Sequence, residues 1–435
     1  MSFPDSFSYH FFPVGQGLFT AGVIGRDHGE PPKYLWVYDC GTSSSGGGVA
    51  NGIATLKAIA GSRERIDLLV LSHFDHDHIS GVCELIKEFE IGTLMLPYMP
   101  LEQRLIVAFE EKAEREGRPD QNAYLNPVSF FLEIDGPGIE QILLVGPSGP
   151  EGPPLSQRQD GQPFWPEEGS PDLRFEPEKT EDDEDVMALI AHSIPQGCQT
   201  RVYFLRRGTA LTLQALWEFL PYNDDRDEPI SRTFTDKVNK ARHALLHGSS
   251  ATQRKSALKR LKAVYDKEFG DDSENRNSIS LHLYSGPIYP TWRDAYLTQH
   301  CKVSPRWVVE SRLRNADFES PERGHQTYGN RKSSIHYTGD GYLDTPERLE
   351  SLIGFITPQR IASIGVFQVM HHGSQTNWHP GVADAIRPFY SVFSSDPERK
   401  RWRHPHAPVL REFWRYGPEQ VDRKRALHVF GQLES

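Results

Sequence analysis

Short runs of apolar, aromatic and β-branched residues, separated by Gly and Pro, dominate the first hundred residues. Such runs are typical of β-strands, which we expect at residues 7–12, 18–24, 34–38, 66–71 and 93–96. Between them, apolar residues at helical spacing predict a helix over residues 82–89, and a short helix is expected over residues 51–60. This part of the chain therefore has the pattern of a β-rich domain with interspersed helices.

The middle of the chain has a different pattern. Residues 147–177 are rich in Pro and Gly, and residues 181–185 are all acidic, which is typical of an exposed or partly disordered loop. We expect a strand at Arg201–Leu205 and a helix over residues 209–220. Residues 236–269 have the pattern of a helical hairpin.

Strand patterns return after residue 275. We expect further strands at residues 278–284, 333–338, 366–370 and 391–394. The chain is therefore expected to form one β-rich domain from residues 1–100 and 271–435, interrupted by a largely helical insertion over residues 101–270. The expected fold class is α/β (α+β).

Composition narrows the class of protein. The 435 residues include 48 Lys and Arg against 59 Asp and Glu, a net charge of 48 − 59 = −11, so the chain is not a general binder of polyanions. The four cysteines form no Cys-x-x-Cys pair, as is usual in a reducing cytosol. We find no signal-peptide pattern and no apolar run approaching the roughly 20 residues of a membrane helix. We therefore expect a soluble, cytoplasmic protein without a membrane partner.

The richest chemistry lies at residues 70–81, which read Val-Leu-Ser-His-Phe-Asp-His-Asp-His-Ile-Ser-Gly. A tight loop after a strand can direct four of these side chains to one point: His73, Asp75, Asp77 and His78. Imidazole nitrogens and carboxylate oxygens are the ligands that hold hydrolytic transition metals. The segment therefore predicts a metal-dependent hydrolase, and further ligands are expected elsewhere in the chain.

Three later polar clusters match this expectation. Tyr-Thr-Gly-Asp-Gly places Asp340 just beyond an expected strand, and Met-His-His-Gly-Ser places His371 and His372 beyond the next one. Arg-His-Pro-His-Ala-Pro begins at Arg403 and includes His404. A lone histidine is seldom a ligand, but several clusters together, most of them at expected strand ends, favour a shared metal site.

With these motifs the chain resembles the metallo-β-lactamase fold superfamily. Within it, the chain is most similar to the branch that includes the hydrolase domain of the bacterial DNA-uptake channel protein and the choline-phosphate esterase of cell-wall modification. The matching segments are Val-Gly-Gln-Gly at 14–17, Tyr-Asp-Cys-Gly at 38–41, residues 72–81, Asn-Ser-Ile-Ser-Leu at 277–281, Thr-Gly-Asp at 338–340, His-His-Gly-Ser at 371–374 and His-Pro-His at 404–406. The resemblance implies an αββα metallo-β-lactamase sandwich with two divalent metal ions, Zn or Mn, at the strand ends.

The resemblance also implies ligands at particular positions. His73 and Asp75 would hold the first metal, and Asp77 and His78 the second. Asp340 would bridge both ions. The final ligand would come from the histidine pair, where we favour His372 because it directly precedes the glycine, while His371 stays open.

Two departures from the family pattern affect the first metal. Asp75 stands where most of the superfamily has a histidine, and its oxygen favours Mn²⁺ more than an all-imidazole site does. The usual third histidine before residue 278 is absent, and Glu274, Asn275 and Asn277 occupy that neighbourhood. His404 either supplies the missing nitrogen or protonates a leaving group.

Two metals about 3.5–4 Å apart clamp a phosphoryl oxygen and activate a water. Catalytic candidates are Asp77, with Asp75 as the alternative, to orient that water, and His371 or His404 as general acid. Asn277 and Ser278 either contact the substrate or tether the loop beneath the metals.

Two basic segments are candidates for substrate binding. The hairpin over residues 236–269 carries an excess of Lys and Arg, including Lys259 and Arg260, and is either a solvated helix face or a clamp for an anion. Arg401 and Arg403 flank Trp402, a composition that suits a phosphate backbone and a stacked base as well as an ordinary basic loop.

The first functional hypothesis is therefore a phosphodiesterase or nuclease acting on a phosphoester substrate such as nucleic acid or a nucleotide. The alternatives are a hydrolase of a non-nucleotide phosphoester, ester or amide, and a signalling or binding module with a degenerate metal site. The sequence leaves the oligomeric state open.

Overall fold

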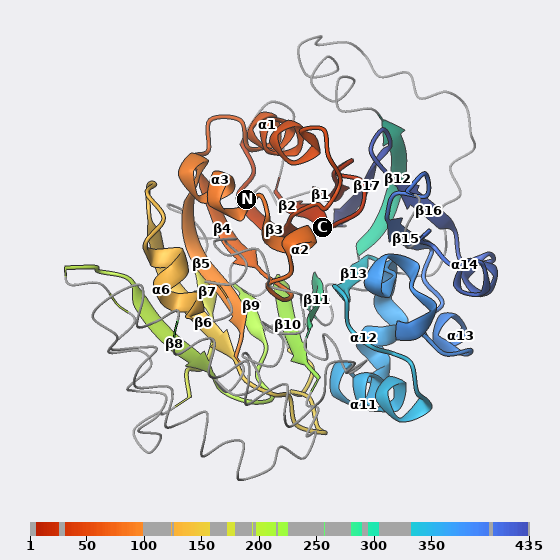
Figure 1. Ribbon diagram of the computed structural model, residues 1–435. Coiled ribbons are helices and arrows are strands. Elements are labelled where there is room, and N and C mark those ends of the chain that lie inside the picture. The colour runs from red at the N-terminus through yellow and green to blue at the C-terminus, as the bar shows by residue number, and fades with distance from the viewer. Residues whose placement is uncertain are drawn as a thin grey trace.

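The computed structural model describes residues 6–25, 31–98, 126–156, 172–178, 197–214, 216–224, 280–288, 295–303, 332–399 and 403–433, together with residues 123, 194 and 256. In this part of the chain two β-sheets pack face to face, and helices cover the outer face of each sheet (Figure 1). This is the αββα sandwich that the sequence predicts.

The first sheet has nine strands in the order β12-β17-β1-β2-β3-β4-β5-β6-β8. Their bounds are β1 Ser6–Phe11, β2 Phe19–Ile24, β3 Tyr34–Cys40, β4 Arg65–Val70, β5 Glu90–Pro97, β6 Ile139–Val145, β8 Arg201–Leu205, β12 Ala295–Val303 and β17 Ala426–Leu433. Pairing is antiparallel from β12 to β3 and parallel from β3 to β8. The first and last described strands, β1 and β17, are therefore neighbours.

The second sheet has eight strands in the order β16-β15-β14-β13-β11-β10-β9-β7. Their bounds are β7 Leu173–Arg174, β9 Leu211–Leu213, β10 Trp217–Asn223, β11 Leu281–Pro287, β13 Ser334–Tyr337, β14 Ile364–Gln368, β15 Tyr390–Ser394 and β16 Pro418–Val421. β13 to β16 run parallel to one another. The carboxyl ends of parallel strands meet at one edge, so the loops that follow β13, β14 and β15 gather there.

Short helices form the two outer layers. On the first sheet lie α1 (Gly48–Ala60), α2 (His76–Ile79), α3 (Val82–Glu88) and α6 (Pro127–Leu132), and on the second lie α11 (Pro346–Ile356), α12 (Pro358–Ser363), α13 (Val382–Ile386) and α14 (Ala407–Phe413). Two 3₁₀ turns, η3 (Met370–Gly373) and η4 (Gln375–Asn377), follow β14. None of the helices in the described ranges is long and apolar enough to cross a membrane.

The apolar side chains form three layers that match this architecture. Aromatic residues fill the space between the sheets, where Tyr38 stacks on Tyr337 with ring centroids 4.6 Å apart and Trp36 lies against Trp217. Burial of such rings is the main source of stability in a sandwich. The inter-sheet layer thus joins β3, which ends with Asp39 and Cys40, to β13, which leads to the turn with Asp340.

The prediction of a helix over residues 209–220 is wrong. β9 and β10 occupy this segment, and β10 is buried along its whole length. A strand covered on both faces is nearly continuously apolar, so its two-residue period is hidden and it resembles a buried helix.

The segment 101–270 contributes strands to both sheets. Its described part contains β6, β7, β8, β9 and β10 but only one helix with defined bounds, α6. The hairpin predicted over residues 236–269 lies outside the described residues apart from Ser256, and so does the acidic run over residues 181–185. The division of the chain into a domain and an insertion remains a prediction.

Candidate metal centre

A short loop after β4 carries the first histidines and aspartates of the site. Asp39, at the end of β3, holds this loop: its Oδ1 accepts from Ser72 N at 2.7 Å and its Oδ2 from Ser72 Oγ at 2.6 Å. Asp39 is fully buried and has a φ of 54°, a left-handed conformation that Asp tolerates better than most residues. Asp39 therefore fixes the backbone of the loop at Ser72. The Nε2 atoms of His73 and His78 point toward Asp340.

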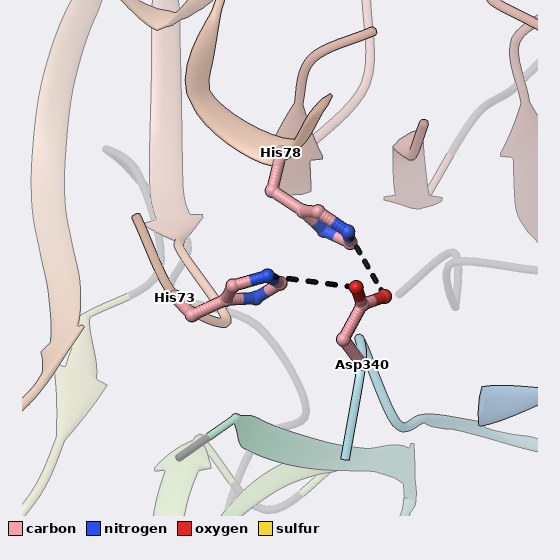
Figure 2. A group of neighbouring side chains, drawn as sticks. All are labelled: His73, His78 and Asp340. Atoms are coloured by element: carbon pink, nitrogen blue, oxygen red, sulfur yellow. Dashed lines mark ion pairs between the residues drawn. The ribbon is translucent and has the colours of Figure 1, made fainter. Parts of the chain in front are cut away.

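Asp340, in the turn after β13, meets these two histidines. Figure 2 shows the rings of His73 and His78 pointing at its carboxylate group, each toward a different oxygen. His78 Nε2 lies 3.0 Å from Oδ1, and His73 Nε2 lies 3.7 Å from Oδ2. Asp75 Oδ2 lies 3.4 Å from His73 Nε2 on the same side. Residues from the two sheets thus converge at one end of the sandwich.

The histidine pair after β14 approaches from a third side. His372 is buried, and its Nε2 lies 3.2 Å from Asp77 Oδ2 and 3.7 Å from Asp340 Oδ1. His371 is 29% exposed, and its Nε2 lies 3.5 Å from Asp340 Oδ2. Within the described residues, two groups have all their ligand atoms within 4.8 Å of one another: His73, His78 and Asp340, and Asp77, His78 and His372.

The ring nitrogen that faces away from the centre has a partner in three of these histidines. His73 Nδ1 lies 2.8 Å from Ser72 Oγ, and His78 Nδ1 lies 2.8 Å from Asp39 Oδ2. His372 Nδ1 donates to the carbonyl oxygen of Ser394 at 2.7 Å. Histidines that bind metals almost always use the second ring nitrogen in this way.

The inner atoms, in contrast, lack hydrogen bonds. His73 Nε2, His78 Nε2 and Asp340 Oδ1 are all buried and have no hydrogen-bond partner among the described residues. An unsatisfied buried polar atom costs about 1–3 kcal/mol. One or two divalent cations at this point would satisfy all three atoms, so the residues present fit a metal centre of nitrogen and oxygen ligands.

The charges of the site support one another. Burial would lower the pKa of His78, but Asp340 and Asp39 hold that pKa well above its ordinary value. Burial would raise the pKa of Asp340, but His371, His78 and His372 hold it well below its ordinary value. The same balance lowers the pKa of Asp77, through its hydrogen bond to His372. The carboxylates are therefore ionised at neutral pH and able to bind a cation.

His404 lies beside the histidine pair of this cluster. Its ring is stacked with that of His372 at 6.1 Å and lies 5.7 Å from that of His371. Its Nδ1 lies 3.3 Å from Gln16 Nε2, in the loop that follows β1. Burial, followed by the nearby histidines, lowers the pKa of His404 to about 3.

The structure therefore brings together eight of the residues singled out from the sequence: His73, Asp75, Asp77, His78, Asp340, His371, His372 and His404. Arg403 is exposed and adjoins His404. Asn277, Ser278, Arg401, Lys259 and Arg260 lie outside the described residues, so their roles remain predictions.

Sequence reasoning missed several residues that orient the site. Asn377 Oδ1 lies 2.8 Å from His371 Nδ1, and Asn377 Nδ2 donates to the carbonyl oxygen of Asp340 at 2.9 Å. Gln16 contacts His404 from the other end of the chain. Gln16 lies within the Val-Gly-Gln-Gly motif and Asn377 lies three residues after the His-His-Gly-Ser motif, but nothing in either motif indicates the long-range contact.

A family model agrees with the fold. The model of the metallo-beta-lactamase superfamily matches residues 30–98, which include β3, β4 and the loop that carries His73 and His78. This match covers part of the chain, and the two-sheet topology agrees with the metallo-β-lactamase fold. No curated protein matches the chain. The narrower resemblance to the DNA-uptake and choline-phosphate esterase branch remains a prediction.

Two solved structures show distant similarity. The metallo-beta-lactamase fold protein YhfI from Bacillus subtilis aligns with 9% identity and a TM-score of 0.36, over 98% of this chain and 100% of that chain. A long form RNase Z from yeast aligns with 8% identity and a TM-score of 0.29, over 83% of this chain but only 32% of its own. At such TM-scores the fold assignment rests on the family match and the sheet topology.

Proposed function

We propose that this protein is a metal-dependent phosphodiesterase or nuclease. The observation that carries the proposal is the arrangement at Asp340, whose two carboxylate oxygens each face histidine nitrogens from different loops. His73, Asp75, Asp77, His78, Asp340 and His372 would hold two divalent cations, Zn or Mn. Such a pair of cations supplies an activated water and neutralises charge on a phosphoryl group in an in-line displacement.

The protein groups around the centre then have separate tasks. Asp77 is ionised and partly exposed, with side-chain exposure of 22%, so it can accept a hydrogen bond from the attacking water. The ring of His404 lies beside that of His372, and because His404 is uncharged at neutral pH it can donate a hydrogen bond to the leaving oxygen. Asp39 and Ser72 hold the loop, so that the side chains need little rearrangement during the reaction.

Positive charge near His404 supports an anionic substrate. Within the described residues, Arg399 donates to the hydroxyl of Ser43 at 2.7 Å, and neither Arg399 nor Arg403 pairs with a carboxylate. In a chain with a net charge of −11, guanidinium groups that have no acidic partner in the described ranges favour a phosphoester such as nucleic acid or a nucleotide.

A substrate screen with the full chain tests the proposal. The protein is loaded with Mn²⁺ or Zn²⁺ and assayed on bis(p-nitrophenyl) phosphate, single- and double-stranded nucleic acids, cyclic nucleotides, p-nitrophenyl acetate and a β-lactam. We expect phosphodiester hydrolysis that EDTA removes and that Asp340→Asn abolishes. The matched control is Asp344→Asn, because Asp344 follows the same turn but pairs with Arg348.

Two outcomes would overturn the proposal. Turnover confined to the ester or the lactam would favour the alternative hydrolase class. Substoichiometric metal with no turnover of any substrate would favour a binding module with a degenerate site. A Zn- or Mn-dependent phosphodiesterase should instead bind about two ions per chain, as a two-metal site requires.

A further inference from the structure

The carboxylate group of Asp340 divides the four inner histidines into two pairs. His78 Nε2 and His372 Nε2 lie 3.0 and 3.7 Å from Oδ1. His73 Nε2 and His371 Nε2 lie 3.7 and 3.5 Å from Oδ2. If Asp340 held two cations, one through each oxygen, each pair of histidines would face one cation position.

The distances of these nitrogens from Asp340, 3.0–3.7 Å, fit direct ligation. Metal–nitrogen bonds of about 2.0–2.1 Å in tetrahedral geometry place ligand atoms roughly 3.3 Å apart. The position at Oδ1 has three side chains at this spacing, since Asp77 Oδ2 lies 3.2 Å from His372 Nε2. The position at Oδ2 has His73 and Asp75, which are 3.4 Å apart, and among the described residues His371 adds a third side chain whose Nε2 faces that oxygen.

We propose that His371 is the third side-chain ligand, with His73 and Asp75, of the cation at Asp340 Oδ2, and that His404 is not a ligand. This inference rests on the two-metal centre of the proposed function. The adjacent residues His371 and His372 then serve different cations, and the missing nitrogen of the first site comes from the loop after β14.

The hydrogen bond at Nδ1 of His371 leaves Nε2 of this ring unprotonated, as a metal ligand requires. Asn377 Nδ2 donates to the carbonyl oxygen of Asp340 at 2.9 Å, which fixes the orientation of the amide. Asn377 Oδ1 must therefore accept from His371 Nδ1 at 2.8 Å. The proton of a neutral His371 is then on Nδ1, and the lone pair of Nε2 is directed at the centre, as in the other three histidines.

His404 has the opposite arrangement. The backbone N–H of Asp396 donates to Gln16 Oε1, so Gln16 Nε2 is the donor that faces His404 Nδ1 at 3.3 Å. Because Nδ1 accepts, the proton of a neutral His404 is on Nε2. This ring offers a hydrogen-bond donor to the substrate and has no lone pair free on Nε2 for a metal.

The backbone at the histidine pair supports a functional constraint. His371 and His372 have φ values of 44° and 59°, and two consecutive non-glycine residues in the left-handed region are costly, at about 1–3 kcal/mol each. In this conformation the two rings lie 5.8 Å apart at 71° to each other. The turn is held to the site by His371 N, which donates to the carbonyl oxygen of Gly339 at 3.0 Å. The strain thus directs two neighbouring imidazoles to different oxygens of Asp340.

Metal counting on the full chain tests this assignment without an activity assay. The protein is stripped with EDTA and titrated with Mn²⁺ alone, with bound ions counted by equilibrium dialysis and their coupling followed by electron paramagnetic resonance. For the wild type we expect two ions and a spin-coupled spectrum, because Asp340 bridges them. For His371→Ala we expect one ion with an uncoupled spectrum, the second binding about 100-fold more weakly or worse.

His404→Ala is the matched control and should keep two coupled ions. Two coupled ions in His371→Ala, or the loss of one ion in His404→Ala, would overturn the inference and leave the proposed function intact. Failure of the wild type to bind any ion would overturn the proposed function itself. Because His371 is 29% exposed, its replacement should fold, and His371→Gln offers a second variant of similar size if it does not.

Discussion

Asp39 and His78 form a buried pair in which Oδ2 of the carboxylate lies 2.8 Å from Nδ1 of the imidazole. Both side chains are fully buried, and Asp39 also accepts two hydrogen bonds from Ser72. A carboxylate behind a metal-binding histidine fixes the ring orientation and strengthens the ring as a ligand. The pair connects the end of β3 to the candidate metal centre.

Asp39→Asn should lower metal affinity without unfolding the protein. Asn tolerates the left-handed conformation at this position, but its amide group cannot accept all three hydrogen bonds. We expect the affinity for Mn²⁺ to fall about 10- to 100-fold, measured by competition with a chelating dye. Asp67→Asn, which removes a buried carboxylate of β4 outside the site, is the control and should bind metal normally.

Asp340→Ala and Asp77→Ala should each abolish hydrolysis. Both variants remove an oxygen that faces a histidine of the centre, and we expect kcat to fall more than about 100-fold. The near-ultraviolet circular dichroism should stay close to that of the wild type. Normal turnover by the Asp340 variant would refute its bridging role.

Arg360→Ala should destabilise the fold strongly. Arg360 of α12 is 1% exposed and donates to both carboxylate oxygens of Glu218 in β10, at 2.8 and 2.9 Å. Removal of one partner leaves the other charge buried and unpaired, which costs about 3–5 kcal/mol in free energy of unfolding. Urea denaturation measures this loss, and Arg360→Met combined with Glu218→Leu should recover most of it. A loss below about 1 kcal/mol would show that the pair is open to water.

The free energy of unfolding should decrease as pH rises, because Asp67 loses a proton that the folded state holds more tightly than the unfolded state. Burial, only partly offset by Arg63 and the N–H of Leu35, raises the pKa of Asp67 from 3.8 to about 6. The folded state therefore keeps its proton to higher pH than the unfolded state, so stability is largest below about pH 4 and is lost as pH rises to about 6. The shift corresponds to about 3 kcal/mol.

Urea unfolding of the wild type and of Asp67→Asn across this range isolates the effect. The difference in unfolding free energy between the two proteins removes titrations that both share, including those of the metal centre. The wild type should lose stability relative to the variant between about pH 4 and about pH 6. A difference that stays constant across that range would contradict the raised pKa.

Charge reversal at Arg403, or at Lys259 with Arg260, should weaken the binding of polyanionic substrates more than the binding of small ones. A long nucleic acid contacts cations beyond the metals, whereas a small chromogenic diester does not. We expect KM for single-stranded nucleic acid to rise about tenfold or more with little change for bis(p-nitrophenyl) phosphate. Lys57→Glu, in the last turn of α1, is the control. Equal effects on both substrates would remove the role of these cations in binding.

Much of the fold was predictable because it depends on local pattern. The strand predicted over residues 34–38 lies within β3, and those over residues 366–370 and 391–394 overlap β14 and β15. The segments that carry the metal-ligand candidates follow strands β4, β13 and β14, and the direction of each strand decides at which edge of its sheet the segment lies. β10 was not predictable, because Glu218 is neutralised by Arg360, far away in the chain, and the strand is buried on both faces.

The sequence by itself determined the types of ligand and their local spacing. His73, Asp75, Asp77 and His78 lie within one short loop, and chain geometry alone keeps them close together. The sequence also determined that Asp340 and the histidine pair follow strands, since apolar runs precede them.

Only the tertiary structure decided which oxygen of Asp340 each histidine faces and which ring nitrogen is available. Those choices depend on Asn377, Gln16 and Asp39, whose hydrogen bonds join segments brought together by the two sheets. The physical reason is that the tautomer of each histidine depends on the residue that hydrogen-bonds to its other ring nitrogen. That residue is brought to the site by the pairing of strands that are far apart in the sequence. The sequence supplied the ligands, and the packing of one sheet on the other assigned their roles.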